Sequence, residues 1–370
     1  MLFFGGTLAY PLLYGWIYNN ETLYDMPVAV IDNSHSAQSR DYIRHLDATP
    51  EVAITHHCIS MAEAQILFTN RQVHGIVLVP ATFADDLARG RQTIVSIYAD
   101  MGSFIYYRGL VTAATFMGMD YGDKVQVKRL TAAGLPSKQA MAAANPIASS
   151  YTPMFNAGSG YGNFLIPAVL VLVIHQTLLL GICMLAGINR EKNKFRLLVP
   201  MSKRYFGTIR IVGGKMLAYF SIYILLIFFV LLLVPRWFGL PHSGNILDIY
   251  LLFVPFLFAV IFFAMTVSAI FHSREAPILM LLFLSIPLVF ISGVVWPLDN
   301  MPAFWRGLAY LLPSTHGVQG FIKINSMGAN FSQVRTEYLA LCLQIIGYGT
   351  TTCLLYKYQI IKTQRAIGRH

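Results

Sequence analysis

Residues 164–188 read FLIPAVLVLVIHQTLLLGICMLAGI, and residues 189–202 continue as NREKNKFRLLVPMS. The first stretch contains no Asp, Glu, Lys or Arg, whereas the second carries four basic residues and one acid. A helix needs about 20 consecutive apolar residues to cross the bilayer core. The stretch therefore predicts a membrane-spanning helix that ends at a strongly basic segment.

The same apolar pattern recurs along the chain. With 56% hydrophobic and 12% charged residues, the chain has about half the charge of an average soluble domain, which excludes a plain globular protein. We expect a mainly α membrane protein with six transmembrane helices. The last of them is the weakest, since Gln344 and Thr350 to Thr352 interrupt it. Besides 164–188, the expected spans are Met1–Tyr18, Met216–Val234, Ile249–Phe271, Ala276–Leu298 and Tyr338–Tyr356.

The distribution of Lys and Arg predicts the orientation. Eight basic residues and only Glu191 lie between 189 and 215, and four more basic residues follow 356. Basic loops stay in the cytoplasm, so the net charge of +10 reflects topology and does not indicate nucleic-acid binding. We expect a multi-pass protein of the inner (plasma) membrane with both ends inside. The first helix lacks the marks of a cleaved signal and is short, which suggests a truncated start.

Residues 19–163 form a polar insertion that we expect to be an extracytoplasmic α/β domain. Strand patterns at 28–32, 52–55, 75–80 and 93–98 alternate with helix patterns at 39–46, 60–71 and 83–88. From 103 to 144 the pattern is helical with a break near 134–136. The expected domains are thus helix 1 at 1–18, the insertion at 19–163 and a five-helix membrane domain at 164–370.

Motifs for catalysis or metal binding are weak. Gly213-Gly214-Lys215 lacks the other positions of a phosphate-binding loop. His56, His57 and Cys58 are adjacent on a strand and point to alternate faces, so we expect no metal site. His175 and Gln176 are polar residues inside the second expected span, where they mark either a substrate pathway or a contact between helices.

The basic segment 189–210 also contains apolar residues that charge does not explain. Phe195, Leu197, Leu198 and Val199 form a short amphipathic piece. Such a piece is costly in water unless lipid or protein covers it, and it could dock into a groove on a cytoplasmic partner.

A proline-rich stretch separates the last two expected spans. Pro277, Pro287 and Pro297 recur at intervals of ten, which should kink or break the helix there. The residues that follow are too apolar for an open loop. We expect interfacial or re-entrant helices over 298–325, with Trp296 and Trp305 as interface anchors.

Taken together, these features resemble the permease subunits of type-2 ABC exporters, in the subgroup with a large extracytoplasmic domain after the first helix. Four stretches carry the resemblance. They are 30–49 (VIDNSHS, SR and LDAT), 75–87 (GIVLVP, Phe83 and Leu87), 154–167 (MFN and NFLIP), and the set Arg190-Glu191, Leu197-Leu198, Pro200 to Ser202, Ser292 to Pro297, Met301-Pro302 and Pro313.

The resemblance implies a half-transporter that dimerises, as a homodimer or a paired permease, and binds separate ABC ATPase subunits. The chain itself would bind no cofactor, since ATP and Mg belong to the ATPase. The implied ATPase-coupling residues are Arg190, Glu191, Phe195, Leu197, Leu198 and Pro200, and the implied re-entrant or gate residues are Ser292, Gly293, Pro297, Met301, Pro302 and Pro313.

The same resemblance implies that the insertion meets a periplasmic adaptor protein and an outer-membrane channel. Two departures are visible. The chain begins inside the first helix, without the usual cytosolic amphipathic segment. It also has Asn193-Lys194-Phe195 where the family often has Gly after the Arg-Glu pair.

The leading hypothesis is an ATP-driven exporter of an amphipathic substrate that works by alternating access between two permeases in the lipid bilayer. A membrane-anchored sensor, receptor or interaction protein is the alternative, although the loops and the tail hold no output domain. A membrane-embedded hydrolase is a third class, but it lacks paired acids or an activated nucleophile.

Overall fold

The structure is a computed structural model that describes residues 2–18, 23–147, 154–156, 160–202, 205–240 and 242–367. The chain divides into two compact units. The first comprises Met1–Glu21 and Pro153–His370, and the second comprises Thr22–Thr152. The expected domain boundary at Asn19, and the basic residues Lys203 and Arg204, lie outside the described residues.

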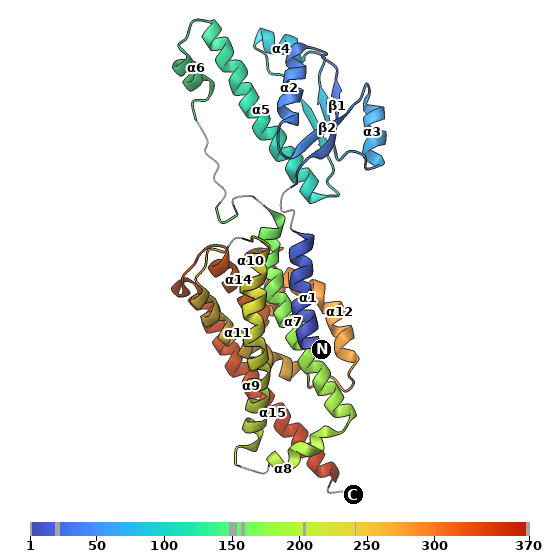
Figure 1. Ribbon diagram of the computed structural model, residues 1–370, viewed down its shortest axis with the longest axis vertical. Coiled ribbons are helices and arrows are strands. Elements are labelled where there is room, and N and C mark those ends of the chain that lie inside the picture. The colour runs from blue at the N-terminus through green and yellow to red at the C-terminus, as the bar shows by residue number, and fades with distance from the viewer. Residues whose placement is uncertain are drawn as a thin grey trace. The chain divides into compact units, whose positions relative to one another are not determined.

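The second unit is built on a four-stranded sheet in the order β2-β1-β3-β4 (Figure 1). β1 pairs in parallel with β2 and β3, and β4 is antiparallel to β3. Alternate residues of β1 enter two different apolar clusters: Val28 and Val30 face one, while Ala29 and Ile31 face the other. This is the period of two that a strand imposes when both faces are buried. The strands are β1 (Met26–Asp32), β2 (Val52–His57), β3 (Gly75–Val79) and β4 (Ser96–Ala99).

Helices cover both faces of this sheet, which confirms the predicted strand–helix alternation. Ser36 begins α2 with a reciprocal capping box, and Ser60 caps α3. The first half of α5 is packed, but among the described residues of this helix none after Tyr121 is buried. The helices are α2 (Ala37–Asp47), α3 (Met61–Thr69), α4 (Phe83–Arg89), α5 (Phe104–Ala132) and α6 (Ser137–Ala144).

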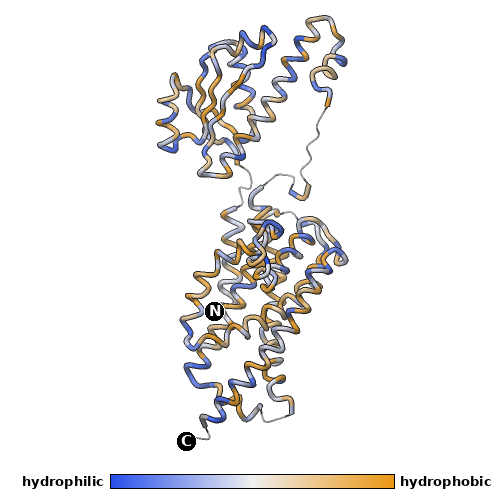
Figure 2. The backbone as a smooth tube through the Cα atoms, turned by 180° about the vertical axis from the view of Figure 1, so that it is seen from behind, coloured by the Kyte–Doolittle hydropathy of each residue, from blue (hydrophilic) through white to orange (hydrophobic). Residues whose placement is uncertain are grey.

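The first unit is a helical bundle around α11, which contacts α7, α9, α14 and α15 (Figure 1). Figure 2 shows that apolar residues dominate its long helices. The helical segments are α1 (Leu2–Ile17), α7 (Tyr161–Glu191), η1 (Lys194–Leu197), α8 (Leu198–Ser202), α9 (Gly207–Ile227), η2 (Phe228–Leu233), α10 (Val234–Trp237), α11 (Ile246–Val267), α12 (Ala276–Ile291), η3 (Leu298–Asn300), α13 (Ala303–Leu311), α14 (Pro313–Asn325), η4 (Phe331–Val334) and α15 (Arg335–Ile367).

Four helical segments among the described residues are long and apolar enough to cross a membrane: Tyr161–Glu191, Gly207–Trp237, Ile246–Val267 and Phe331–Arg365. The expected count of six is therefore not reached on length, because α1 and α12 have 16 residues each. The fifth expected span ends at Ile291 rather than Leu298. Gly293 adopts a φ of 83°, which a residue with a side chain rarely accepts, and the helix stops just before it.

The helix that begins as α9 contains a π-helical turn, η2, before it continues as α10. Pro235 is the second residue after this turn. Proline has no amide hydrogen, and its ring collides with the carbonyl four residues earlier. A wider turn at 228–233 relieves that collision, so the sequence explains why the α geometry is interrupted here.

Hydroxyl groups join the helices inside the apolar bundle. The Thr7 hydroxyl donates to Thr177 Oγ1 at 3.0 Å, and the Tyr223 hydroxyl donates to the same oxygen at 3.1 Å, which links α1, α7 and α9. Thr352 of α15 donates to the carbonyl of Phe262 at 3.0 Å. The threonines that weaken the hydropathy of the last span thus include one that bonds α15 to α11.

Candidate functional site

The end of α7 is hydrogen-bonded to the connection between α11 and α12. The Arg190 guanidinium donates to the carbonyls of Ser268, at 2.8 Å, and Phe271, which lie just beyond the end of α11. A cation is favourable there because the last carbonyls of a helix lack intrahelical partners. Glu191 Oε1 accepts a hydrogen bond from the Arg274 amide at 2.8 Å. The Arg-Glu pair therefore acts within the chain, holding a neighbouring loop on both sides.

Close backbone packing between α7 and the 268–274 connection accompanies these hydrogen bonds. A Cβ atom placed on Gly187, one turn before Arg190, would lie 2.7 Å from the carbonyl carbon of Ser273 and 2.9 Å from the amide nitrogen of Arg274. Such distances are too short for a real side chain. Glycine at this position lets the 268–274 connection lie directly against α7.

A second cluster joins the basic segment to α9 and α15. The buried ring of Phe195 lies 5.8 Å from both the Arg190 guanidinium carbon and Lys215 Nζ, and 6.1 Å from the Tyr356 ring. Lys215 Nζ also donates to the Tyr356 hydroxyl at 3.2 Å. Cations over aromatic faces contribute about 0.5–2 kcal/mol each. We call Arg190, Phe195, Lys215 and Tyr356 the basal junction.

The exposed residues of the segment differ from the expected set. Phe195 and Val199 are buried in the chain's own core, so their side chains are not available to a partner in this structure, and Leu198 is half-buried. Leu197 is 70% exposed, and Pro200 is also exposed. Three further apolar side chains are exposed just downstream. Together the exposed set, which we call the basal patch, comprises Leu197, Pro200, Tyr205, Phe206 and Ile209.

Sequence reasoning missed part of both features. The sequence marks Lys215 as one of the basic residues at 189–215 and as part of an incomplete phosphate-binding motif, and it marks Tyr356 as the end of an apolar stretch; neither pattern predicts that the two side chains meet. The aromatic pair Tyr205-Phe206 between basic residues was a usable signal for an exposed patch, since aromatic residues are costly in an open polar loop. Spacing alone could not bring Phe195 and Tyr356 together.

The expected gate residues lie where short helices begin and end. Ser292 is buried, and its carbonyl accepts a hydrogen bond from Gln319 Nε2 at 3.0 Å. Pro302 precedes α13 and Pro313 begins α14, which are positions that suit a residue without an amide hydrogen. Pro297 precedes η3 and Met301 follows it. The structure thus places two short helices, α13 and α14, within the stretch 298–325 where short helices were predicted.

Hydrogen bonds fasten these short helices to their neighbours. The carbonyls at the end of α13 accept from α15: Gln344 Nε2 donates to Tyr310 at 2.9 Å and the Tyr348 hydroxyl donates to Leu311 at 2.6 Å. At the end of α14, Lys323 Nζ lies 2.6 Å from Glu337 Oε1. Each of the two short helices is therefore secured to α15 at its C-terminal end.

His175 and Gln176 occupy a different part of α7 from the basal junction. His175 is fully buried, stacks on Phe263 at 6.0 Å between ring centroids, and has no hydrogen-bond partner at either ring nitrogen in the described part of the chain. Gln176 Nε2 lies 3.4 Å from the carbonyl of Ser285 in α12. Gln176 therefore makes the helix contact that was one of its two expected roles.

Comparison with known proteins gives a consistent result. The family model described as ABC-2 family transporter protein matches residues 1–354. The chain is 22% identical to the linearmycin resistance permease protein LnrN of Bacillus subtilis (strain 168) over 353 residues, which are 88% of this chain and 85% of that protein. It is also 26% identical to ABC transporter G family member 20 of Dictyostelium discoideum over 141 residues.

That second match covers 38% of this chain, which spans about a fifth of the length of the Dictyostelium protein (19%). The family match, by contrast, extends over both compact units and includes the basal junction residues Arg190, Phe195 and Lys215. Because the family model covers far more than half of the sequence, the chain belongs to the ABC-2 transporter family.

Proposed function

We propose that this chain is the membrane permease subunit of an ATP-driven exporter, and that separate ABC ATPase subunits, which bind ATP and Mg, press on the basal patch. The observation that carries the proposal is the exposure of Leu197, Tyr205 and Phe206 in the segment between Phe195 and Lys215, two residues of the junction that joins α7, α9 and α15. Apolar groups exposed among basic residues are typical of a protein interface. The printed name of the Bacillus relative, a resistance permease, supports export.

The proposed topology has six crossings: α1, α7, α9 with α10, α11, α12 and α15. The short helices α1 and α12 span about 24 Å each at 1.5 Å per residue, which a locally thinned bilayer accommodates. The eight basic residues at 190–215 support a cytoplasmic location for the basal patch in the inner membrane. Residues 19–163 are then extracytoplasmic, and α13 and α14 are re-entrant helices with Ser292, Gly293 and the prolines at their ends.

The proposed transport path lies between two permeases, which are identical or paired. One side of α12 supports this, because Leu282, Phe283 and Ile286 are 67%, 76% and 67% exposed while the helix contacts α7. Lipid or a second permease would cover such a surface. An amphipathic substrate would pass along α7 and α12 near His175 and Gln176. A periplasmic adaptor and an outer-membrane channel would then receive it through the 19–163 domain.

Coupling would run through the basal junction. Movement of the basal patch is transmitted to Arg190 and Glu191, which hold the α11–α12 connection, and to Lys215 and Tyr356 on the two other helices. Closure of the ATPase subunits thereby shifts α12 relative to α7, which alternates access to the path.

The test is co-purification of the chain with an ABC ATPase subunit, which we expect the neighbouring reading frame to encode. We expect Leu197→Asp with Tyr205→Asp to lose the ATPase, since both side chains are mostly exposed and their replacement should leave the fold intact. The matched control is Ile59→Asp, an apolar residue that is 92% exposed in the second unit. Equal recovery of the ATPase with both variants would refute the basal patch as the ATPase-binding surface. Failure of inverted vesicles that contain the wild-type complex to take up amphipathic substrates in the presence of ATP would refute export.

A further inference from the structure

A groove in the second unit lies between α2, α4 and the second half of α5. Its volume is about 630 Å³, within the range of small-molecule sites. The groove forms because α5 continues past the sheet after Tyr121. Beyond that residue, α2 and α5 no longer share an apolar core. The Tyr121 hydroxyl of α5 donates to the carbonyl of Gln38 in α2 at 3.1 Å, which joins the two helices within the groove.

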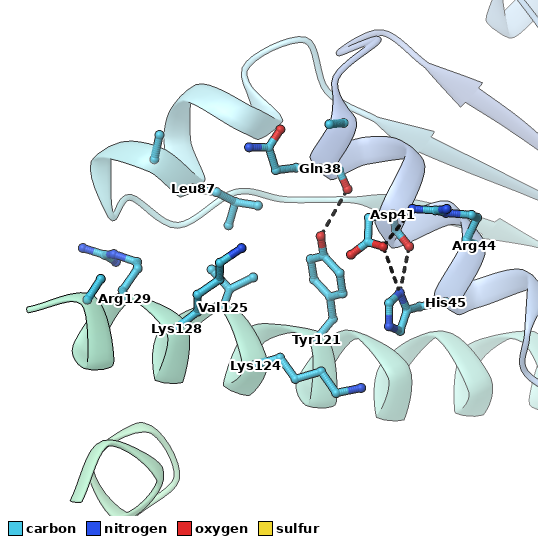
Figure 3. Close-up of a pocket in the computed structure, with 13 residues that line it drawn as sticks. Gln38, Asp41, Arg44, His45, Leu87, Tyr121, Lys124, Val125, Lys128 and Arg129 are labelled. Atoms are coloured by element: carbon cyan, nitrogen blue, oxygen red, sulfur yellow. Dashed lines mark hydrogen bonds and ion pairs between the residues drawn. The ribbon is translucent and has the colours of Figure 1, made fainter. Parts of the chain in front are cut away.

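The lining of the groove has an apolar part and a cationic part. Leu87 and Ala88 of α4 and Val125 and Ala132 of α5 supply the apolar part. Figure 3 shows Leu87 and Val125 pointing toward each other, with Lys128 and Arg129 beside them. A ligand that lies here therefore meets hydrocarbon and positive charge together.

Asp41 is the one acid among the residues that line the groove, and it has a cationic partner, whereas two of the lining cations lack acidic ones among the described residues. Asp41 lies 3.1 Å from Arg44 Nη2, and Asp120 lies 2.6 Å from Lys124 Nζ. Lys128 and Arg129 form no ion pair within the described part of the chain. Arg129 lies against the end of α4, since a Cβ on Gly90 would be 2.7 Å from its guanidinium carbon. The groove therefore carries uncompensated positive charge.

We propose that this groove binds an anionic amphiphile, a phosphate or carboxylate group attached to an alkyl chain, with the anion on Lys128 and Arg129 and the chain between Leu87 and Val125. Arginine and lysine donate charge-assisted hydrogen bonds to phosphate and carboxylate oxygens. The alkyl chain gains from leaving water at about 0.8 kcal/mol per buried methylene. This site does not depend on the transport proposal. Its ligand comes either from solution or from bilayer lipid.

The experiment uses the full chain in phosphatidylcholine nanodiscs and measures the rate at which an amine-reactive reagent acylates Lys124, by mass spectrometry. Lys124 lines the groove and its side chain is 57% exposed, so bound ligand shields it. The probe is octyl phosphate, compared with inorganic phosphate and octyl glucoside. Lys138 of α6, which does not line the groove, gives the reference rate in the same sample.

We expect octyl phosphate to slow acylation of Lys124 but not of Lys138. Lys128→Gln with Arg129→Gln should raise the half-protecting concentration at least tenfold. The matched control, Arg71→Gln with Arg108→Gln, removes two positive charges outside the groove, keeps the reference Lys138, and should leave protection of Lys124 unchanged. Protection without octyl phosphate in nanodiscs that contain phosphatidic acid identifies a lipid ligand, and protection by octyl phosphate alone identifies a soluble one.

Three results would overturn the proposal. Equal protection in the two double variants would show that Lys128 and Arg129 hold no anion. Protection by inorganic phosphate at the same concentration as octyl phosphate would remove the role of the alkyl chain. Protection by octyl glucoside as strong as that by octyl phosphate would remove the role of the charge.

Discussion

Replacing Gly187 with alanine should weaken the contact between α7 and the α11–α12 connection. The added Cβ would lie 2.7 Å from the Ser273 carbonyl carbon, whereas carbon atoms in contact lie about 3.5 Å apart or more. The obstructing atoms are backbone, so no rotamer change relieves the overlap. The backbone of the connection must therefore move away from α7 by roughly 0.8 Å.

That movement is large enough to weaken the hydrogen bonds that Arg190 and Glu191 make with the connection. Arg190 to the Ser268 carbonyl and the Arg274 amide to Glu191 are each 2.8 Å, and an extra 0.8 Å would take them to about 3.6 Å, beyond hydrogen-bond range. Either the strain is retained or these bonds are lost, and both routes cost about 1–3 kcal/mol.

The assay is thermal unfolding in detergent, with Gly213→Ala as the control. A Cβ on Gly213, within α9, meets no atom within 4 Å, so this variant gains the helix propensity of alanine, about 1 kcal/mol, without a clash. We expect Gly187→Ala to unfold at a lower temperature than both the wild-type protein and Gly213→Ala. An unfolding temperature at or above that of the control would refute the close packing described here.

Three further predictions concern other parts of the chain. Glu337→Gln should lower the free energy of unfolding by about 1–3 kcal/mol, because the Glu337 side chain is 10% exposed and its ion pair with Lys323 is lost; a double-mutant cycle by chemical denaturation measures the coupling. Thr177→Val should cost about 1 kcal/mol in the same assay, since it removes two hydrogen bonds between helices that are worth about 0.6 kcal/mol each in membranes. Burial, with the neighbouring Tyr121, raises the pKa of Tyr42, and burial with Asp41 raises the pKa of Tyr121. These phenols ionise more readily in the unfolded chain, so their contribution to stability is complete below about pH 10 and is lost as the pH rises through their folded pKa values; denaturant titrations at pH 8 and pH 11, compared with the Phe variants, check the sign.

Hydropathy and strand–helix alternation predicted most of the elements. The apolar run at 164–188 lies inside α7, and the capping signals at Ser36 and Ser60 begin helices. The position at which α12 ends was not predicted, because an apolar run continues past a helix stop that depends on the backbone angle of Gly293. Apolar content predicts burial in lipid or protein but does not locate the end of the helix.

The candidate site was predicted less completely. The basic segment and Arg190 were found because charge clusters are visible in one dimension. The basal junction was not, because Phe195 reaches Lys215 and Tyr356 only after three helices pack together. The sequence indicates that the Phe195 side chain should be buried by lipid or protein. The fold shows that other parts of the same chain bury it.

The π turn at 228–233 divides one long helix between two sets of neighbours. Before it, α9 contacts α11, α15 and α8 and makes a smaller contact with α1; at and after it, η2 contacts α1 and α7, and α10 contacts α1. One residue turns an α-helix by about 100°. Removing a single residue from this turn would hardly change its apolar character, yet it would rotate Arg236 and Trp237 away from their present directions. The number of residues in the π turn, independently of their hydropathy, therefore determines which side chains α10 presents to α1.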